Sequence, residues 1–118
     1  MFCREDGCRG FYVDVAVKYG VDEAILLQHM IHELDAAYML RKHGMGGNFE
    51  FVITGNQPWL PWTLNDLQSQ LPFWTLHQVR RVVSSCLGKG LIQADNYNQN
   101  PFDRRLWYSV PGVNFAHE

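Results

Sequence analysis

Between residues 22 and 43, apolar side chains recur every three or four positions, which is the period of an α-helix. The acidic residues of this stretch come at its start, at 22–23, and the basic residues come at its end, at 41–43. This order suits the helix dipole, which favours negative charge at the N-terminus and positive charge at the C-terminus. The pattern therefore predicts a long amphipathic helix over residues 22–43 that ends near Gly44.

A shorter helix is predicted before it, because Asp14 can cap a helical turn and Gly20 can supply the backbone conformation that ends one. After the long helix, apolar and polar residues alternate over positions 48–54, which predicts a short, half-buried strand. Glycine, proline and asparagine are frequent at 45–48 and 55–61, so we expect both stretches to be loops.

Two further helices are predicted over residues 63–71 and 75–89, each opened by a threonine that stands three positions before an acid or an amide. A hydroxyl at the cap and a carboxylate or amide at the third helical position satisfy free backbone N–H groups reciprocally. The pairs are Thr63 with Asp66 and Thr75 with Gln78. Pro72 forces the residue before it out of helical geometry, so a turn separates the two helices.

Beyond these helices, Gly90 can supply the left-handed residue that ends the second one. Residues 91–95 and 106–110 predict two strands around the turn-forming segment 96–103, and together they make a β-hairpin. A helix-turn-helix followed by such a hairpin is the arrangement of a winged helix. We therefore expect an α+β, mainly α, fold: a winged helix-turn-helix with a C-terminal β-hairpin wing.

The chain has 118 residues, of which 47% are hydrophobic and 19% are charged, so we expect one folded domain over residues 1–118. Its core would span residues 13–110, with 1–12 and 111–118 as terminal extensions. The formal net charge is −2, so any surface that binds nucleic acid must be local. No apolar run is long enough to span a membrane and the first residues do not resemble a signal peptide, which favours a cytoplasmic protein of a bacterium or phage-infected host cell.

The predicted helix 75–89 carries one apolar stripe and one polar face. After a helix-turn-helix, such a face presents donors and acceptors that can meet base edges and phosphates in a major groove. An ordinary solvated helix face is the alternative interpretation. The DNA-binding candidates on this helix are His77, Gln78, Arg80, Arg81, Ser84 and Lys89.

Two further candidates, Arg104 and Arg105, begin the second strand of the predicted wing, beside the polar tip at 96–100. A wing reaches phosphates or the minor groove from such a position. Strand alternation allows only one of the two arginines to face DNA directly. A structural ion pair between Asp103 and Arg104 is the competing interpretation.

Four zinc-competent side chains lack the usual spacing of a zinc finger, so solvated or core positions are favoured over a metal site. They are Cys3, Cys8, His29 and His32. No acid–base pair or glycine-rich phosphate loop accompanies them, so we expect no enzyme, cofactor or small-molecule substrate. The tryptophans could stack single-stranded bases, but core packing is favoured for them. They are Trp59, Trp62, Trp74 and Trp107.

Several segments of the second half resemble the winged-helix domain of phage and plasmid replication initiators and DnaD-like replisome organisers. They are WLPWTLNDLQSQLPFWT at 59–75, VRRV at 79–82, LGKGLI at 87–92 and DRRLWY at 103–108. The stretch VDEAILLQ at 21–28 is similar to the start of the long helix that precedes this domain in the family. The likeness covers about residues 13–110. It implies a DNA-contacting helix at 75–89, with Arg80 and Arg81 in the matching positions, and a basic wing at Arg104.

Two classes of function follow from these patterns. The first is binding of double-stranded DNA, in replication initiation or transcriptional regulation. The second is a protein-protein interaction module, such as a phage-encoded inhibitor or an assembly domain, which the net acidity favours. The acids on the long helix are Asp22, Glu23, Glu33 and Asp35. A homodimer through residues 22–43 suits either hypothesis.

Overall fold

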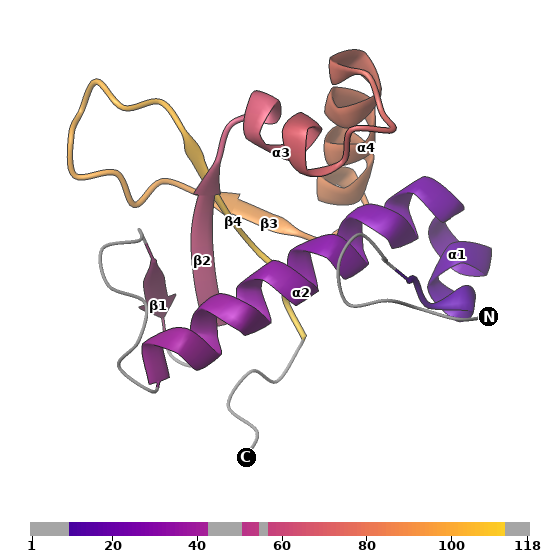
Figure 1. Ribbon diagram of the computed structural model, residues 1–118, viewed down its shortest axis with the longest axis horizontal. Helices are drawn as coiled ribbons and strands as arrows, with labels where there is room; N and C mark the ends of the chain where they lie inside the picture. The colour runs from indigo at the N-terminus through magenta and orange to yellow at the C-terminus, as the bar shows by residue number, and fades with distance from the viewer. Residues whose placement is uncertain (1–9, 43–50, 55–56, 113–118) are drawn as a thin grey trace.

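The computed structural model describes residues 10–42, 51–54 and 57–112. In these ranges the chain forms one α+β domain of four helices and a four-stranded antiparallel sheet (Figure 1). In chain order the elements are α1 (Val13–Tyr19), α2 (Val21–Lys42), β1 (Val52–Thr54), β2 (Gln57–Trp62), α3 (Leu64–Gln70), α4 (Leu76–Gly88), β3 (Gln93–Asp95) and β4 (Leu106–Ser109).

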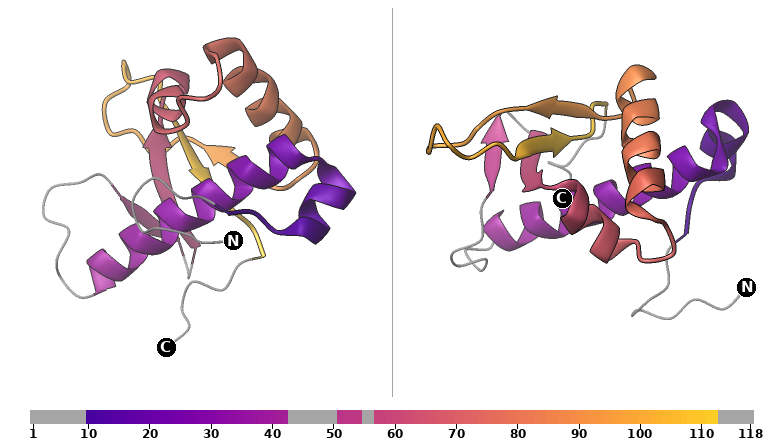
Figure 2. Two further views of the ribbon diagram at one scale, coloured as in Figure 1. Left: turned by 45° about the vertical axis from the view of Figure 1, so that its right-hand side comes forward. Right: turned by 90° about the horizontal axis from the view of Figure 1, so that it is seen from above.

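The four strands follow the order β1-β2-β4-β3 across the sheet, so the strand before α3 lies beside the last strand of the hairpin. In β2, Leu60 pairs with Tyr108 of β4, and Trp59 pairs with Val52 of β1. Helix α2 crosses the sheet and packs against β2 and α4, while α3 and α4 stand together at one side (Figure 2).

The loop predicted over 55–61 is wrong for its described part, because residues 57–61 belong to strand β2. The prediction rested on Pro58 and Pro61, which cannot donate to a strand ladder. Each neighbouring strand pairs with only half of β2: β1 with residues 57–59 and β4 with residues 60–62. Burial of the large aromatic side chains of β2 then outweighs the breaker signal, since such side chains contribute the largest packing areas.

Strand β1 confirms the second half of the strand predicted over 48–54, and residues 48–50 lie outside the described part. The loop predicted over 45–48 lies outside it as well. The hairpin strands β3 and β4 confirm the predicted pair, each one or two residues shorter than expected.

Helix α1 is present, but Asp14 is not its cap. The helix begins after Tyr12, which makes no side-chain capping bond, and Asp14 lies in the first turn. Gly20 ends the helix as predicted, with a φ of 121° that other residues rarely adopt. Helix α2 follows immediately and confirms the predicted long helix, which begins one residue earlier than expected.

Both predicted capping boxes are present. The Thr63 hydroxyl accepts from the N–H of Asp66 at 3.0 Å, and the Thr63 N–H donates to the Asp66 carboxylate at 2.9 Å. At the start of α4, the Thr75 hydroxyl accepts from the N–H of Gln78 at 3.1 Å, while the Thr75 N–H donates to the Gln78 side chain at 2.8 Å. Gly90 stands just beyond α4 with a φ of 74°, as its predicted role requires.

The core lies where α2, α4 and the sheet meet. Its largest fully buried side chains include Leu26, Met30 and Leu34 from α2. The apolar stripe of α4 packs against them and consists of Val79, Val82, Val83 and Cys86. Burial raises the pKa of the Cys86 thiol to about 12, so this cysteine is a core side chain and not a nucleophile.

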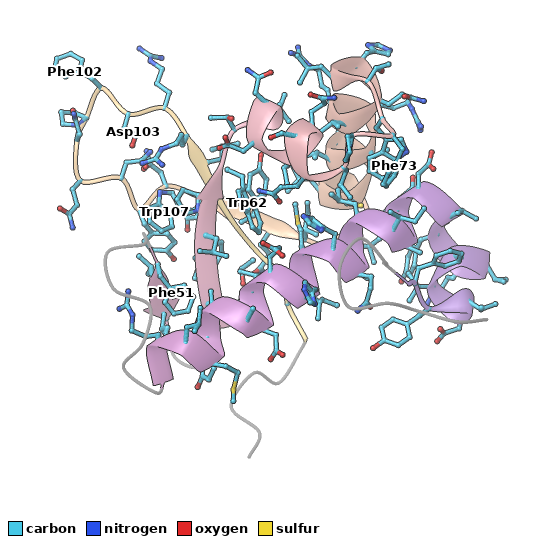
Figure 3. All side chains as sticks on the ribbon, viewed as in Figure 1. Phe51, Trp62, Phe73, Phe102, Asp103 and Trp107 are labelled. Atoms are coloured by element: carbon cyan, nitrogen blue, oxygen red, sulfur yellow. The ribbon has the colours of Figure 1, made fainter. Side chains whose placement is uncertain are left out.

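All four tryptophans are buried, which confirms the prediction that they pack in the interior. Figure 3 shows Trp62 and Trp107 against the sheet, whereas the labelled Phe73 and Phe102 lie at the periphery. Trp62 stacks on Tyr108 of the neighbouring strand, with ring centroids 6.2 Å apart.

Candidate nucleic-acid interface

The polar face of α4 is divided into two stripes that have different environments. The first stripe consists of Arg81, Ser85 and Lys89, which are spaced four residues apart and therefore share one side of the helix. All three side chains contact the first turn of α2. Arg81 pairs with Asp22 at 2.9 Å, and the Ser85 hydroxyl donates to the Glu23 carboxylate at 2.5 Å. We call these three residues the docking stripe.

Glu23 is the centre of this contact, because its side chain is buried and receives two donors from α4. The Lys89 ammonium lies 3.3 Å from the Glu23 carboxylate and also donates to the carbonyl of Tyr19 at 2.8 Å. A Cβ atom at Gly20 would collide with the same carboxylate. The charge of Lys89 is therefore used to join α1, α2 and α4.

The protonation of Glu23 follows from these contacts. Burial alone raises the pKa of its carboxyl group, but hydrogen bonds from Ser85, its own backbone and Lys89 outweigh that effect. The net result is a pKa below the ordinary value of 4.5. Glu23 is thus charged at neutral pH although it is only 8% exposed.

The second stripe of α4 consists of His77, Arg80 and Ser84, and all three side chains are exposed. None of them makes a hydrogen bond or ion pair with another residue of the described part of the chain. We call these residues the outer stripe. Gln78 uses its side-chain oxygen in the capping box with Thr75.

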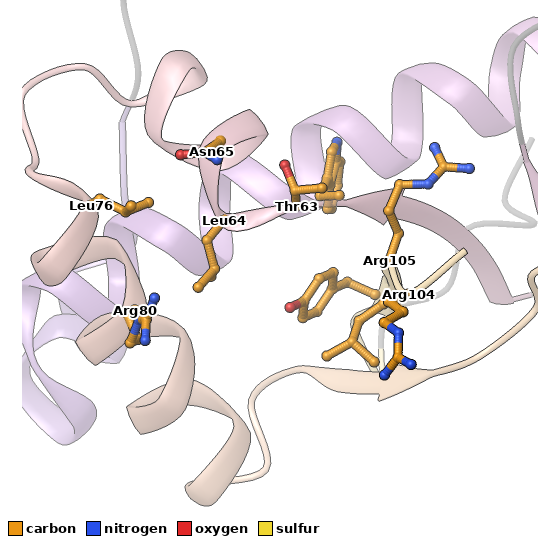
Figure 4. Close-up of a pocket in the computed structure, with 10 residues that line it drawn as sticks. Thr63, Leu64, Asn65, Leu76, Arg80, Arg104 and Arg105 are labelled. Carbon is orange, nitrogen blue, oxygen red and sulfur yellow. The ribbon is translucent and has the colours of Figure 1, made fainter. Parts of the chain in front are cut away.

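Arg80 of the outer stripe borders a groove of about 540 Å³ between the helix pair and the hairpin, whereas His77 and Ser84 do not line it (Figure 4). Arg80 stands on its α4 side and Arg104 on its hairpin side. The other lining residues are Trp62, Thr63, Leu64, Asn65, Leu76, Arg105, Leu106 and Tyr108. The lining thus holds three arginines and no acidic residue, although the chain as a whole has a net charge of −2.

The strand alternation expected for Arg104 and Arg105 does not apply, because both residues lie before β4, but their surroundings do differ. Arg105 binds both oxygens of the Asp103 carboxylate, the shorter contact being 2.7 Å. These hydrogen bonds hold the pKa of Asp103 below its usual range. The expected ion pair therefore forms with Arg105 and not with Arg104. Arg104 is exposed and pairs with no acid among the described residues.

Asn98 holds the base of the β3–β4 loop and was not identified from the sequence. Its amide nitrogen donates to the carbonyls of Asp103 at 3.0 Å and Arg105 at 2.8 Å. Its amide oxygen accepts from the Trp107 indole N–H at 2.7 Å. The sequence signals only a turn-rich segment here, and no local pattern distinguishes Asn98 from the neighbouring asparagines.

The structure brings together Arg80 and Arg104 from the predicted site residues, with His77 and Ser84 on the same side of α4. It places Arg81 and Lys89 in contacts with α2, and it pairs Arg105 with Asp103. Arg81 keeps about half of its side chain exposed, but its guanidinium lies on a different side of the helix from Arg80. The candidate interface is therefore smaller than the set of basic residues suggested.

The zinc-competent residues do not assemble in the described part of the chain, where no three His, Cys, Asp or Glu side chains cluster. Cys3 and Cys8 lie outside that part. The buried His29 has its Nε2 atom 2.6 Å from the side-chain oxygen of Gln70, so it joins α2 to α3. Within the same ranges, no helix combines the length and the apolar character that crossing a membrane requires.

Comparison of the chain with family models, curated proteins and solved structures gave no match. The function must therefore be inferred from the geometry and charge of the interface.

The Glu23 contact predicts a pH-dependent stability. We expect Glu23→Gln to lower the free energy of unfolding at neutral pH by about 1–3 kcal/mol, because a buried, hydrogen-bonded charge is lost. Since the folded-state pKa of Glu23 lies below 4.5, its contribution is complete above that pH and disappears as the pH falls further. Urea unfolding at a series of pH values should show the parent and the variant converging in acid.

Asp35→Asn is the matched control, because Asp35 is an acid on the same helix that makes no ion pair with the other described residues. Its free energy of unfolding should change between neutral and acidic pH by the same amount as that of the parent. A constant gap between Glu23→Gln and the parent at every pH would contradict the proposed charge state of Glu23.

Proposed function

We propose that this chain is a winged-helix protein that binds double-stranded DNA through α4 and the β3–β4 hairpin. Two features of the fold support the winged-helix assignment. Helices α3 and α4 are joined by a short turn and are followed at once by the hairpin. Strand β2, which precedes α3, pairs with β4 and so attaches the hairpin to the helix pair.

The observation that carries the proposal is the juxtaposition of Arg80 and Arg104 across one groove that contains no acid. Guanidinium groups bind phosphate oxygens through charge-assisted hydrogen bonds, and such contacts supply most of the affinity for a duplex. Both guanidinium groups are exposed and are not engaged with an acid in the described structure. They can therefore reach phosphates without breaking an existing ion pair.

The outer stripe supplies groups that can reach base edges. His77 lies in the first turn of α4 and Ser84 lies two turns further along the same side. In helix-turn-helix proteins the second helix enters the major groove with its N-terminal residues towards the bases. His77 would then meet the bases first, Arg80 would meet the phosphates beside them, and Arg104 would meet the backbone or the minor groove. Replication initiation and transcriptional regulation both fit this proposal.

We predict that Arg80→Ala and Arg104→Ala each weaken binding to a mixed-sequence duplex by about tenfold at low salt, because each removes a phosphate contact. Each should also lower the slope of log affinity against log salt concentration by about one. Fluorescence anisotropy with a labelled duplex at several salt concentrations measures both quantities.

Arg81→Ala is the matched control, because Arg81 is the next residue of the same helix but pairs with Asp22. It should change affinity and salt slope much less than Arg80→Ala. Equal effects of the two substitutions would show that binding reflects net charge and not the groove. Absence of duplex binding by the parent chain at low salt would remove the proposed function.

Association with a protein partner is the second candidate function, and an exposed apolar strip on α1 favours it. Val13 and Val17 lie one turn apart on α1 and are mainly exposed, and α1 buries none of its own residues. Val21, which is also mainly exposed, opens α2 beyond Gly20. The inward side of α2 is occupied by the core, so a homodimer through residues 22–43 would have to use its outer side. There Met39 and Leu40 are exposed.

If this strip joins two copies of the chain, sedimentation velocity should show a dimer at high concentration, and Val17→Asp should shift the population to monomer. The substitution should leave unchanged the affinity for a duplex that is long enough for only one copy of the chain, because no residue of α1 lines the groove. A parent chain that is monomeric at every concentration would rule out self-association.

A further inference from the structure

The loop between β3 and β4 places Phe102 at its outer end. The side chain is 88% exposed, more than any other large apolar residue of the described chain. Figure 3 shows it at the extremity of the loop, directed away from the body of the domain. An isolated apolar side chain on a surface is common, so the local structure must show whether this one is held in place.

A hydrogen-bonded turn fixes the backbone on both sides of Phe102. The N–H of Asp103 donates to the carbonyl of Asn100 at 3.0 Å, and the N–H of Phe102 donates to the Asn100 side chain at 2.9 Å. Pro101 occupies the second position of this turn, where its ring fixes φ. The phenyl ring is therefore presented from a defined backbone and not from a freely moving loop.

The base of the loop is also fixed, by the Asn98 contacts described above and by aromatic packing. The Tyr97 ring lies 5.3 Å from Trp59 and 6.1 Å from Trp107, measured between ring centroids. The loop is thus attached to β2 and β4 through buried aromatic side chains. Such preorganisation lowers the entropy that is lost when a loop binds its target.

The charges near the tip favour an anionic target. Between residues 96 and 105 the only charged side chains are Asp103, Arg104 and Arg105. Both oxygens of Asp103 are bound by Arg105, which leaves Arg104 as the neighbour that faces solvent. An exposed phenyl ring thus stands two residues from an available guanidinium group.

We infer that Phe102 is an apolar wedge that inserts between adjacent base pairs from the minor groove and bends the duplex. This inference rests on the proposed DNA-binding function and deepens it. Wedges of this kind partly unstack one base step, and the cost of unstacking is offset by the contacts that the bent duplex makes. Burial of the phenyl ring and a phosphate contact by Arg104 supply those contacts here.

Ring closure of a short DNA fragment tests the wedge without knowledge of the binding site. A duplex of about 100 base pairs closes poorly alone, because it is shorter than the persistence length of DNA. With the parent chain present, ligase should form circles of such a fragment. We expect Phe102→Ala to reduce circle formation about tenfold at equal occupancy, and Phe102→Leu to keep most of it because an apolar wedge remains.

Occupancy is set from a separate binding assay with the same fragment. Tyr12→Ala is the control, because Tyr12 is an exposed aromatic side chain that lies outside both the groove and the valine strip. It should form circles as the parent does.

Binding by the parent without added circle formation would overturn the wedge and leave the proposed function intact. Equal circle formation by the parent and Phe102→Ala at equal occupancy would also overturn it. Absence of any duplex binding by the parent would overturn both, so the two failures are distinguishable.

Discussion

The orientation of α4 about its own axis is the constraint on which the interface depends, and the buried carboxylate of Glu23 sets it. Adjacent residues of a helix point about 100° apart, so a small rotation would exchange the surroundings of Arg80 and Arg81. The apolar stripe of α4 fixes the side that faces the core. Ser85 and Lys89 then fix the side that faces α2, because both donate to Glu23. Arg80 is left facing the groove.

This arrangement explains how a chain of net negative charge can present a local cationic surface. Asp22, Glu23 and Asp103 each have a basic partner within the molecule, so three of the acids near α4 and the β3–β4 hairpin are neutralised in place. The arginines that line the groove meet no acid there. Net charge therefore describes the solubility of the whole chain better than the electrostatics of this surface.

The sequence predicted the elements whose signals are local. Capping boxes at Thr63 and Thr75 depend on residues three positions apart, and the helical periods depend on residues within two turns, so both could be identified without tertiary contacts. Strand β2 could not be predicted in this way, because its prolines locally indicate a loop. Its strand conformation depends on pairing with β1 and β4, which the local sequence does not show. Local sequence also cannot distinguish Arg80 from Arg81, since only Arg81 pairs with Asp22, which lies 59 positions away in the chain. The hydrogen bond between Asn98 and the Trp107 indole likewise depends on the position of Trp107 in the folded hairpin.

The most direct test of the account is an NMR titration of the folded protein with a short duplex, in which the arginine side-chain Nε–H signals are followed individually. We predict that the signals of Arg80 and Arg104 move together as DNA is added. The signals of Arg81 and Arg105 should keep the chemical shifts of the DNA-free protein, because these side chains remain paired with Asp22 and Asp103. Movement of the Arg81 signal while that of Arg80 stays fixed, or the absence of any change, would contradict the assignment of the groove as the DNA-binding surface.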